Sequence, residues 1–169
     1  IILFALSYMY GVSGTTNIFE IGAIFATQEN AQLQYIAGLS FFIFVIGISF
    51  KLATVPFHMW APDVYEGSPT PVTTFLSAVS KAAGFALFIR IIVTVYITAR
   101  MDDIGFLSIF TANQNYLAVL AGITMIVGNL IALRQKNLKR MLAYSSIAHA
   151  GYLLAAIAAF GEYTIESVW

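Results

Sequence analysis

The sequence predicts an all-α, polytopic membrane protein, because it is apolar, poor in charge and divided into long hydrophobic segments. Of its 169 residues, 60% are hydrophobic and 9% are charged, and the mean hydropathy is +0.85. A soluble globular protein carries roughly 25% charged residues. The hydrophobic segments approach the length of about 20 residues that a membrane-spanning helix needs. We therefore expect an integral membrane protein embedded in a lipid bilayer.

The composition also excludes several classes of function. The formal net charge is zero, so nothing indicates a nucleic-acid partner. The chain has no cysteine, which excludes cysteine-ligated iron–sulfur clusters, thiolate metal sites and disulfides within it. Its two histidines are too few for most metal or haem sites, and it carries no Gly-rich nucleotide loop or Walker pattern. Any redox chemistry is therefore expected on a partner.

The beginning of the chain is too short to form a complete span. Residues 1–13 are apolar from Ile1 onward and predict the second half of a transmembrane helix. Because the sequence has no initiator Met and stops at Trp169 after a polar stretch, we expect a fragment of a longer protein. Residues 14–17 read GTTN, which is turn chemistry, and residues 17–34 predict a short interfacial helix or a loop.

A broken helix is predicted over residues 35–60. An apolar run from Tyr35 ends at Lys51, and apolar character resumes up to Trp60. The first part of this run would rise about 24 Å as a helix, short of a hydrocarbon core about 30 Å thick. Pro56 removes a backbone donor and clashes with the preceding turn, so the helix must kink or break near it. Broken backbone at membrane depth lines a cavity or is buried in protein, and it builds ion sites in transporters.

Three further spans follow within what we interpret as one membrane domain, 1–169. Residues 61–71 contain strong turn formers and predict a loop. Thr70 as N-cap and Pro71 at the first helical position predict the start of the next helix. A polar segment at 100–112 predicts a second loop. The predicted spans are residues 71–98, 114–133 and 141–160.

The basic residues predict how the chain lies in the membrane. Segment 134–140 reads RQKNLKR and carries four of the eight lysines and arginines. Cytoplasmic loops are enriched in these residues. We therefore expect this segment and, by alternation of the spans, the loop 61–70 on the cytoplasmic side.

Two lysines stand at membrane depth. Lys51 ends one apolar run, and Lys81 lies about 15 Å along the next predicted helix. Charges at this depth are costly and usually mark an ion or substrate path. Lysines that lose hydration can titrate near neutrality, so two of them linked by water would make a proton relay. The alternative is a purely structural role, with each lysine held charged by a carboxylate, although no acidic residue of this chain lies at matching depth.

Two histidines are candidates beside the lysines. His149 falls about 16 Å along the last predicted helix and could pass protons; it could equally be a neutral histidine bonded to a serine or carbonyl between packed helices. His58 is assigned with Pro56, Pro62 and Asp63 to the structural break. There it would bond carbonyls of the broken helix or Asp63.

Other polar residues support weaker hypotheses. Asp63 and Glu66 form a carboxylate pair of the kind used in hydrolysis, but turn formers surround them and no catalytic partner accompanies them. Arg90 lies near a helix end and is best explained as a snorkelling anchor. Six small polar residues could line a water path, although helix packing explains each of them better: Ser77, Ser80, Thr124, Asn129, Ser145 and Ser146.

Three segments carry a resemblance to a known family. They are GTTN at 14–17, FKLATVPFHMWAPDVYEGSPTPVTTFLSAVSKAAGFAL at 50–87, and NLIALRQKNLKRMLAYSSIAHAGYLL at 129–154. With these motifs the chain resembles the subunit N family of bacterial NADH-quinone oxidoreductase (respiratory complex I), whose counterparts are mitochondrial and plastid subunit 2. Related antiporter-like subunits share the broken helix and the two lysines, whereas the DVYEGSPTPV form points to subunit N.

The resemblance implies an antiporter-like fold with inverted repeats, each with a broken helix. It implies that Lys51 pairs with a glutamate on a helix outside this sequence, that Lys81 is the central relay lysine, and that His149 lies on a hydrated axis between the repeats. It also implies a bacterial inner (plasma) membrane, with other membrane subunits of complex I as partners. NAD, FMN, iron–sulfur clusters and quinone are expected on partner subunits, with no cofactor in this chain.

Three functions follow from these interpretations. The first is a proton-translocating subunit of NADH-quinone oxidoreductase, which would couple quinone reduction to proton transfer without a redox site of its own. The second is a subunit of a cation/proton antiporter without redox partners. The third is a purely structural membrane-arm subunit with inert lysines.

Overall fold

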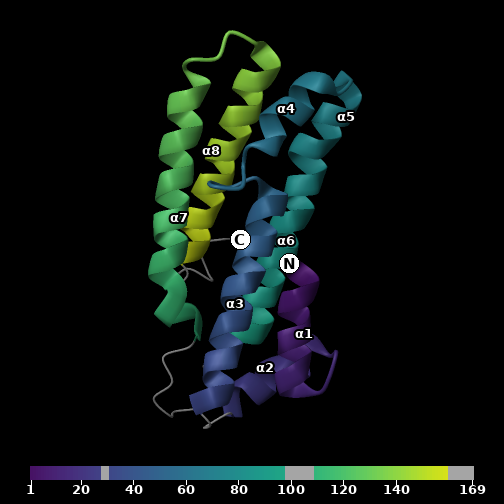
Figure 1. Cartoon of the computed structure of the whole chain (residues 1–169), viewed down its shortest axis with the longest axis vertical. Coiled ribbons are helices and arrows are strands. Elements are labelled where there is room, and N and C mark those ends of the chain that lie inside the picture. Colours follow the sequence, from purple (N-terminus) through teal and green to yellow (C-terminus); the bar gives the residue numbers. More distant parts are fainter. Residues whose placement is uncertain (28–30, 98–108, 160–169) are drawn as a thin grey trace. The chain divides into compact units, whose positions relative to one another are not determined.

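The computed structural model describes residues 1–27, 31–97 and 109–159, and all the regular elements in these ranges are helices. Four helical segments of the described chain are long and apolar enough to cross a membrane (Figure 1). They are Tyr35–Leu52, Thr70–Tyr96, Asn113–Ala132 and Leu138–Ala158. The predicted all-α membrane fold is therefore confirmed, whereas the exact membrane boundaries of the predicted spans stay a prediction.

The chain divides into two compact units. The first unit contains Ile1–Ile48 and Ala86–Asn113, and the second contains Ser49–Phe85 and Gln114–Trp169. Helices α3 (Ala31–Leu52), α6 (Lys81–Ile91) and α7 (Ile109–Ala132) contribute residues to both units. Both membrane-depth lysines fall in the second unit, which therefore holds the candidate site.

In the first unit, a capped turn joins α1 (Ile2–Ser13) to α2 (Ile18–Thr27). Gly14 adopts a φ of 69°, a left-handed conformation that glycine takes without steric cost. Its N–H bonds the Tyr10 carbonyl and closes α1. Asn17 Oδ1 accepts a 3.1 Å bond from the Phe19 N–H and caps α2. The GTTN turn is thus confirmed, and the following segment contains the short helix rather than a loop alone.

An aromatic cluster fills the core of the first unit. Tyr96, in the π-helical turn η2 (Ile92–Ile97), packs edge-on against Phe41 of α3, with ring centroids 4.9 Å apart. The Tyr96 hydroxyl and the buried Ser40 hydroxyl lie 3.1 Å apart and share a hydrogen bond. Phe44 and Phe88 stack at 6.1 Å between centroids. Buried tyrosine normally requires such a polar partner, and Ser40 supplies it.

The second unit is built from helix ends, a short helix and one helical hairpin. After α3 come α4 (Trp60–Gly67), α5 (Thr70–Phe75) and the π-helical turn η1 (Leu76–Ser80), which continues directly into α6. The hairpin consists of α7 (Ile109–Ala132) and α8 (Leu138–Ala158). The two helices run side by side and are joined by a short connection (Figure 1).

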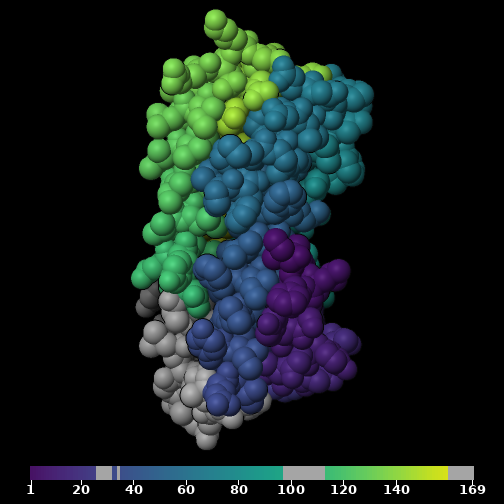
Figure 2. Space-filling model, in the orientation of Figure 1, coloured from purple at the N-terminus to yellow at the C-terminus, as the bar shows by residue number. Residues whose placement is uncertain are grey.

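Helix α7 lies at the surface of the second unit (Figure 2), and its exposed large side chains are apolar or aromatic. Its exposed large side chains follow one another at intervals of three or four residues, which places them on one side of the helix. Such a face suits lipid or a further apolar helix. The exposed side chains are Tyr116, Val119, Ile123, Ile126 and Leu130, and Leu133 directly after the helix is exposed too.

The prediction of a loop over residues 61–71 is wrong. The segment is not a loop throughout, because α4 occupies Trp60–Gly67. Pro62 is compatible with this helix because it lies in the first turn, where a backbone N–H would have no intrahelical partner. Asp63 also suits a helix N-terminus, where a carboxylate complements the helix dipole. The turn formers therefore mark helix ends rather than a continuous loop.

The remaining boundaries differ by small amounts. The N-cap of α5 is Pro69 rather than Thr70, which places Pro71 one position further into the helix. Helix α7 begins at Ile109, inside the segment predicted as loop, while the preceding residues 98–108 lie outside the described ranges. Helix α8 begins at Leu138, so the end of the basic segment is helical.

Glycines allow α7 and α8 to approach closely. A Cβ added at Gly128 of α7 would lie 2.8 Å from the Ala148 backbone nitrogen of α8. A Cβ added at Gly151 of α8 would lie 2.9 Å from the Met125 backbone nitrogen of α7. Small residues at helix interfaces permit this contact between backbones in membrane proteins. The hairpin therefore depends on two glycines, one on each helix.

We expect Gly128→Ala to destabilise the protein. The added methyl group meets backbone atoms that cannot move aside separately, and overpacking of this kind costs about 1–3 kcal/mol. Gly122→Ala is the matched control on the same helix, because a Cβ there meets nothing within 4 Å, and replacing glycine by alanine within a helix is neutral or stabilising by up to about 1 kcal/mol. Thermal unfolding of the full-length protein in detergent measures both, and an equal melting temperature for the two variants would contradict the close-packing argument.

Candidate functional site

Helix α3 ends before Pro56, the residue from which the break was predicted. It ends at Leu52, and Ala53 takes a φ of 57°. Residues 53–59 are irregular, and the Val55–Pro56 peptide bond is cis. Both Ala53 and Thr54 are fully buried. The predicted broken helix near Pro56 is confirmed, with the helix already ended four residues earlier.

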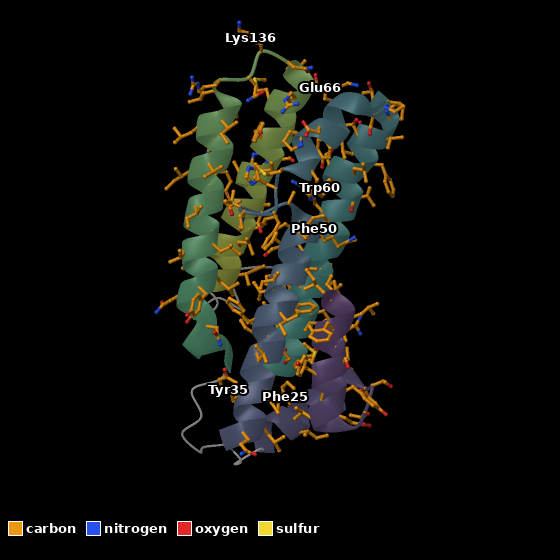
Figure 3. The ribbon with its side chains drawn as sticks, viewed as in Figure 1. Phe25, Tyr35, Phe50, Trp60, Glu66 and Lys136 are labelled. Atoms are coloured by element: carbon orange, nitrogen blue, oxygen red, sulfur yellow. The ribbon has the colours of Figure 1, made fainter. Side chains whose placement is uncertain are left out.

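Side chains satisfy the backbone groups that the break releases. Thr124 of α7 accepts a 3.2 Å hydrogen bond from the Val55 N–H and donates to the Leu120 carbonyl of its own helix at 2.6 Å. On the other side, Trp60 Nε1 donates to the Phe50 carbonyl at 3.0 Å, and the two rings stack (Figure 3). Buried backbone groups must be paired, so these contacts hold the broken segment in one conformation.

Lys51 lies in the last turn of α3, directly before the break. Its Cε lies 3.6 Å from the position that a Cβ on Gly84 of α6 would occupy. Gly84 is three residues after Lys81, and residues at this spacing lie on the same side of a helix. The structure thus brings Lys51 to the part of α6 that carries Lys81. The Lys51 side chain itself is exposed.

Lys81 is buried, with 9% of its surface exposed. It follows the π-helical turn η1 and opens α6. Its Nζ donates two 2.8 Å hydrogen bonds, to the backbone carbonyl and to the hydroxyl of Ser146 in α8. Within the described ranges no carboxylate forms an ion pair with Lys81. The predicted structural alternative, a lysine held by a carboxylate, therefore has no support among these residues.

Ser146 stands at the centre of a small polar cluster. While it accepts from Lys81, its hydroxyl donates to the Ala143 carbonyl at 2.9 Å. Tyr65 of α4 is buried, and its hydroxyl forms no hydrogen bond of good geometry with the described residues. Burial raises the pKa of the Tyr65 phenol, and the nearby Ser146 side chain lowers it in part. Tyr65 was missed at the sequence level, because Ser146, the residue near its hydroxyl, lies on a distant helix.

The two histidines lie apart from the lysine contacts. His149 is on α8, exposed, with its ring 5.8 Å from that of Tyr152. It lies one turn after Ser146, and the Lys81 hydrogen bonds in the described chain go to Ser146 instead. His58 lies buried in the broken segment, with its ring 6.3 Å from that of Tyr144 and its Nδ1 unpaired within the described chain.

A surface clamp joins α4 to the start of α8. Arg140 donates 2.8 Å hydrogen bonds to Asp63 Oδ1 and Glu66 Oε2, and Asn137 donates to Glu66 Oε1 at 2.7 Å. Lys139 Nζ reaches the Ser68 carbonyl at 2.9 Å. Figure 3 labels Glu66 at this end of the second unit.

The clamp changes the interpretation of the acidic pair. Asp63 and Glu66 serve α4–α8 packing, and Asp63 bonds Arg140 rather than His58. The sequence contains both halves of this clamp, two acidic residues in segment 61–71 and a run of basic residues in segment 134–140. Sequence spacing alone does not pair them.

The whole chain, residues 1–169, matches the family described as "NADH:quinone oxidoreductase/Mrp antiporter, TM". The chain belongs to this family. Curated relatives include NADH-quinone oxidoreductase subunit N of Bacillus anthracis, 49% identical, and of Geobacillus kaustophilus, 52% identical, each over the entire chain. The chain spans about a third of these relatives, 33% of each. The resemblance stated from the motifs is confirmed.

Solved structures support the same family fold. One belongs to the membrane-bound sulfane sulfur reductase, an archaeal respiratory membrane complex, with a TM-score of 0.76 and 29% identity over 93% of this chain and 30% of that one. Another belongs to respiratory complex I from Thermus thermophilus, with a TM-score of 0.69 and 36% identity over 92% of this chain and 30% of that one. The antiporter-like fold expected for this membrane protein is thereby confirmed.

We expect Thr124→Val to destabilise the break. Valine keeps the shape of threonine but leaves the half-buried Val55 N–H without its acceptor, which costs about 1–3 kcal/mol. Thr74→Val is the matched control, because exposed Thr74 bonds only the Thr70 carbonyl of its own helix among the described residues. Thermal unfolding in detergent compares the two. Similar stability for both variants would show that Thr124 does not hold the broken segment.

Proposed function

We propose that this chain is part of a proton-translocating membrane-arm subunit of an NADH-quinone oxidoreductase. In this proposal quinone reduction on partner subunits drives proton transfer through Lys51, Lys81 and His149. The observation that carries it is the burial of Lys81 on α6 against neutral hydrogen-bond acceptors. The Lys51 side chain lies against Gly84, one turn further along the same helix. The names of the relatives, all subunit N of NADH-quinone oxidoreductase, support the choice of complex.

A buried amine with neutral partners suits reversible protonation. Hydrogen bonds to the Ser146 carbonyl and hydroxyl stabilise the ammonium without fixing it in an ion pair. A carboxylate partner would hold the charge more strongly, because hydrogen bonds between two ionised groups are the stronger kind. The Lys51 side chain lies against Gly84, one turn of α6 from Lys81. A change in the charge around Lys51 would then be felt at Lys81 through space.

The redox groups belong to partners in this proposal. NAD, FMN, iron–sulfur clusters and quinone would bind to other subunits of the complex. In the described part of the chain no group of histidine, aspartate and glutamate side chains could hold a metal ion. In this proposal the chain is a translocase subunit without a cofactor of its own.

The proposal places the protein in a bacterial plasma membrane. Bacterial relatives support this location. The basic residues of segment 134–140 support a cytoplasmic position for this segment and for segment 61–70. The clamp from Arg140 to Asp63 and Glu66 is consistent with one side for both segments, since it joins them directly.

The alternative is a cation/proton antiporter subunit without redox partners. It is favoured only by the family description, which also covers Mrp antiporters. Purification of the complex from native membranes separates the two. NADH-oxidising subunits that copurify with this chain support the first function, whereas their absence together with cation-driven proton exchange supports the second.

We expect Lys81→Arg to abolish most proton translocation while leaving the complex assembled. Arginine keeps the positive charge and hydrogen-bond donors but does not release its proton in proteins. NADH-to-quinone turnover and the proton gradient are recorded together in sealed vesicles carrying the intact complex, with Lys81→Ala in parallel. Both quantities should fall sharply for both variants.

Arg90→Gln is the control for these variants, since exposed Arg90 lies on the same helix α6. It should leave turnover and gradient unchanged. Normal translocation by Lys81→Arg would mean that Lys81 is a fixed structural charge, and the relay would have to be abandoned.

A further inference from the structure

The polar cluster around Lys81 contains one hydroxyl that can serve two protonation states. Ser146 Oγ accepts from Lys81 Nζ at 2.8 Å and donates to the Ala143 carbonyl at 2.9 Å. A hydroxyl has one donor and two acceptor sites, and its hydrogen rotates freely. The Ala143 carbonyl lies inside α8, where a helix N–H also bonds it. Withdrawing the Ser146 hydrogen from that carbonyl therefore leaves no orphaned group.

Removing a proton from Lys81 changes the hydrogen-bond partners that its amine requires. The ammonium has three donors and no acceptor, whereas the neutral amine has a lone pair that must receive a hydrogen bond. Ser146 Oγ is already within 2.8 Å of Nζ. A rotation of its hydrogen from the Ala143 carbonyl toward Nζ supplies that bond with no movement of heavy atoms. Ser146 can thus stabilise Lys81 before and after it releases a proton.

Tyr65 provides the second half of the arrangement. Its hydroxyl is buried without a well-formed bond among the described residues, although Ser146 lies close enough to affect its titration. A buried hydroxyl without a partner is costly, and its presence requires an explanation. When Ser146 turns its hydrogen toward Lys81, both lone pairs of Ser146 Oγ are open, and the Tyr65 hydroxyl can donate to one of them. While Lys81 is charged, the phenol would have to share Ser146 Oγ with the ammonium, whose positive hydrogens repel its own hydrogen. The phenol therefore bonds Ser146 more readily when Lys81 is neutral, and it favours that state.

Tyr65 also connects the lysine to a separate helix. It lies on α4, which follows the break and is joined to the start of α8 by Arg140, Asp63 and Glu66. A small displacement of α4 relative to α8 would bring the Tyr65 hydroxyl into bonding distance of Ser146 or withdraw it. Such a displacement would change which state of Lys81 is favoured.

We propose that Ser146 and Tyr65 are positioning residues that control proton release from Lys81. Ser146 exchanges its hydrogen bond between the Ala143 carbonyl and the lysine, and Tyr65 on α4 stabilises the second arrangement. This inference rests on the proposed function, since it needs Lys81 to release a proton. It adds α4 as the element whose position sets the state of the lysine.

The test uses the intact complex in sealed vesicles, with proton translocation and NADH-to-quinone turnover as readouts. Ser146→Ala removes the hydroxyl but keeps the backbone carbonyl that also holds Lys81, so the complex should assemble. Translocation should fall about tenfold, as expected for the loss of one hydrogen bond to a charged group. Ser146→Thr restores a hydroxyl and should recover most of the rate. Ser145→Ala, one residue earlier, is the control and should behave as the unmodified complex.

Tyr65→Phe separates a functional role from a structural one. Among the described residues the Tyr65 hydroxyl has no well-formed hydrogen bond to lose, so a structural role predicts equal or greater stability with normal translocation. Our proposal predicts equal or greater stability with translocation slowed about threefold. Because Tyr65 acts through Ser146, the double variant should be no slower than Ser146→Ala alone.

Each outcome decides the proposal. If Lys81→Arg fails but Ser146→Ala, Ser146→Thr and Tyr65→Phe all translocate normally, the relay stands and this inference falls. A slow Ser146→Ala that Ser146→Thr does not rescue would also overturn it, because packing rather than the hydroxyl would matter. Additive losses in the double variant would overturn the role of Tyr65. If Lys81→Arg translocates normally, the relay and the inference fall together.

Discussion

The interaction on which the second unit depends is the contact of a buried ammonium group with neutral oxygen atoms. Lys81 places a charge between helices, and Ser146 supplies both of its acceptors. Burying a charge is expensive unless hydrogen bonds compensate it, so α6 and α8 must stay at one separation. The glycine contacts between α7 and α8, and the clamp between α4 and α8, hold the helix that carries Ser146. Ser146 therefore takes part in both the packing of α8 and the hydrogen bonding of Lys81.

The break in α3 serves the same site. Ending the helix at Leu52 leaves Lys51 at a carboxyl end, where the helix dipole favours a positive charge. It also frees the chain to turn into α4, which brings Tyr65 against α8. A continuous helix would carry the chain past this position. The contacts of Thr124 and Trp60 therefore do more than repair lost backbone bonds, because they fix where the charge and the phenol lie.

The sequence was sufficient for the fold class, the break and the buried lysine, because these follow from composition, one proline and hydrophobic context. It was insufficient for the partners of the lysine. Ser146 was one of six small polar residues that looked alike, since a serine that packs and a serine that binds an ammonium share the same local pattern. Helix α4 was missed because Pro62 and Gly67 are compatible either with a loop or with the first and last turns of a helix. Tertiary contacts, not local propensity, decide these cases.

The positions of the two lysines also limit how the site can work. Lys51 reaches Gly84, one turn from Lys81, so both amines face the same stretch of α6. Two ammonium groups at such a place repel each other, and water around the exposed Lys51 side chain weakens the repulsion. In the proposed relay, a proton arriving at Lys51 would therefore disfavour the proton on Lys81 unless another group balances the charge. The neutral partner Ser146 leaves Lys81 free to respond to that repulsion, which a carboxylate in the same position would suppress.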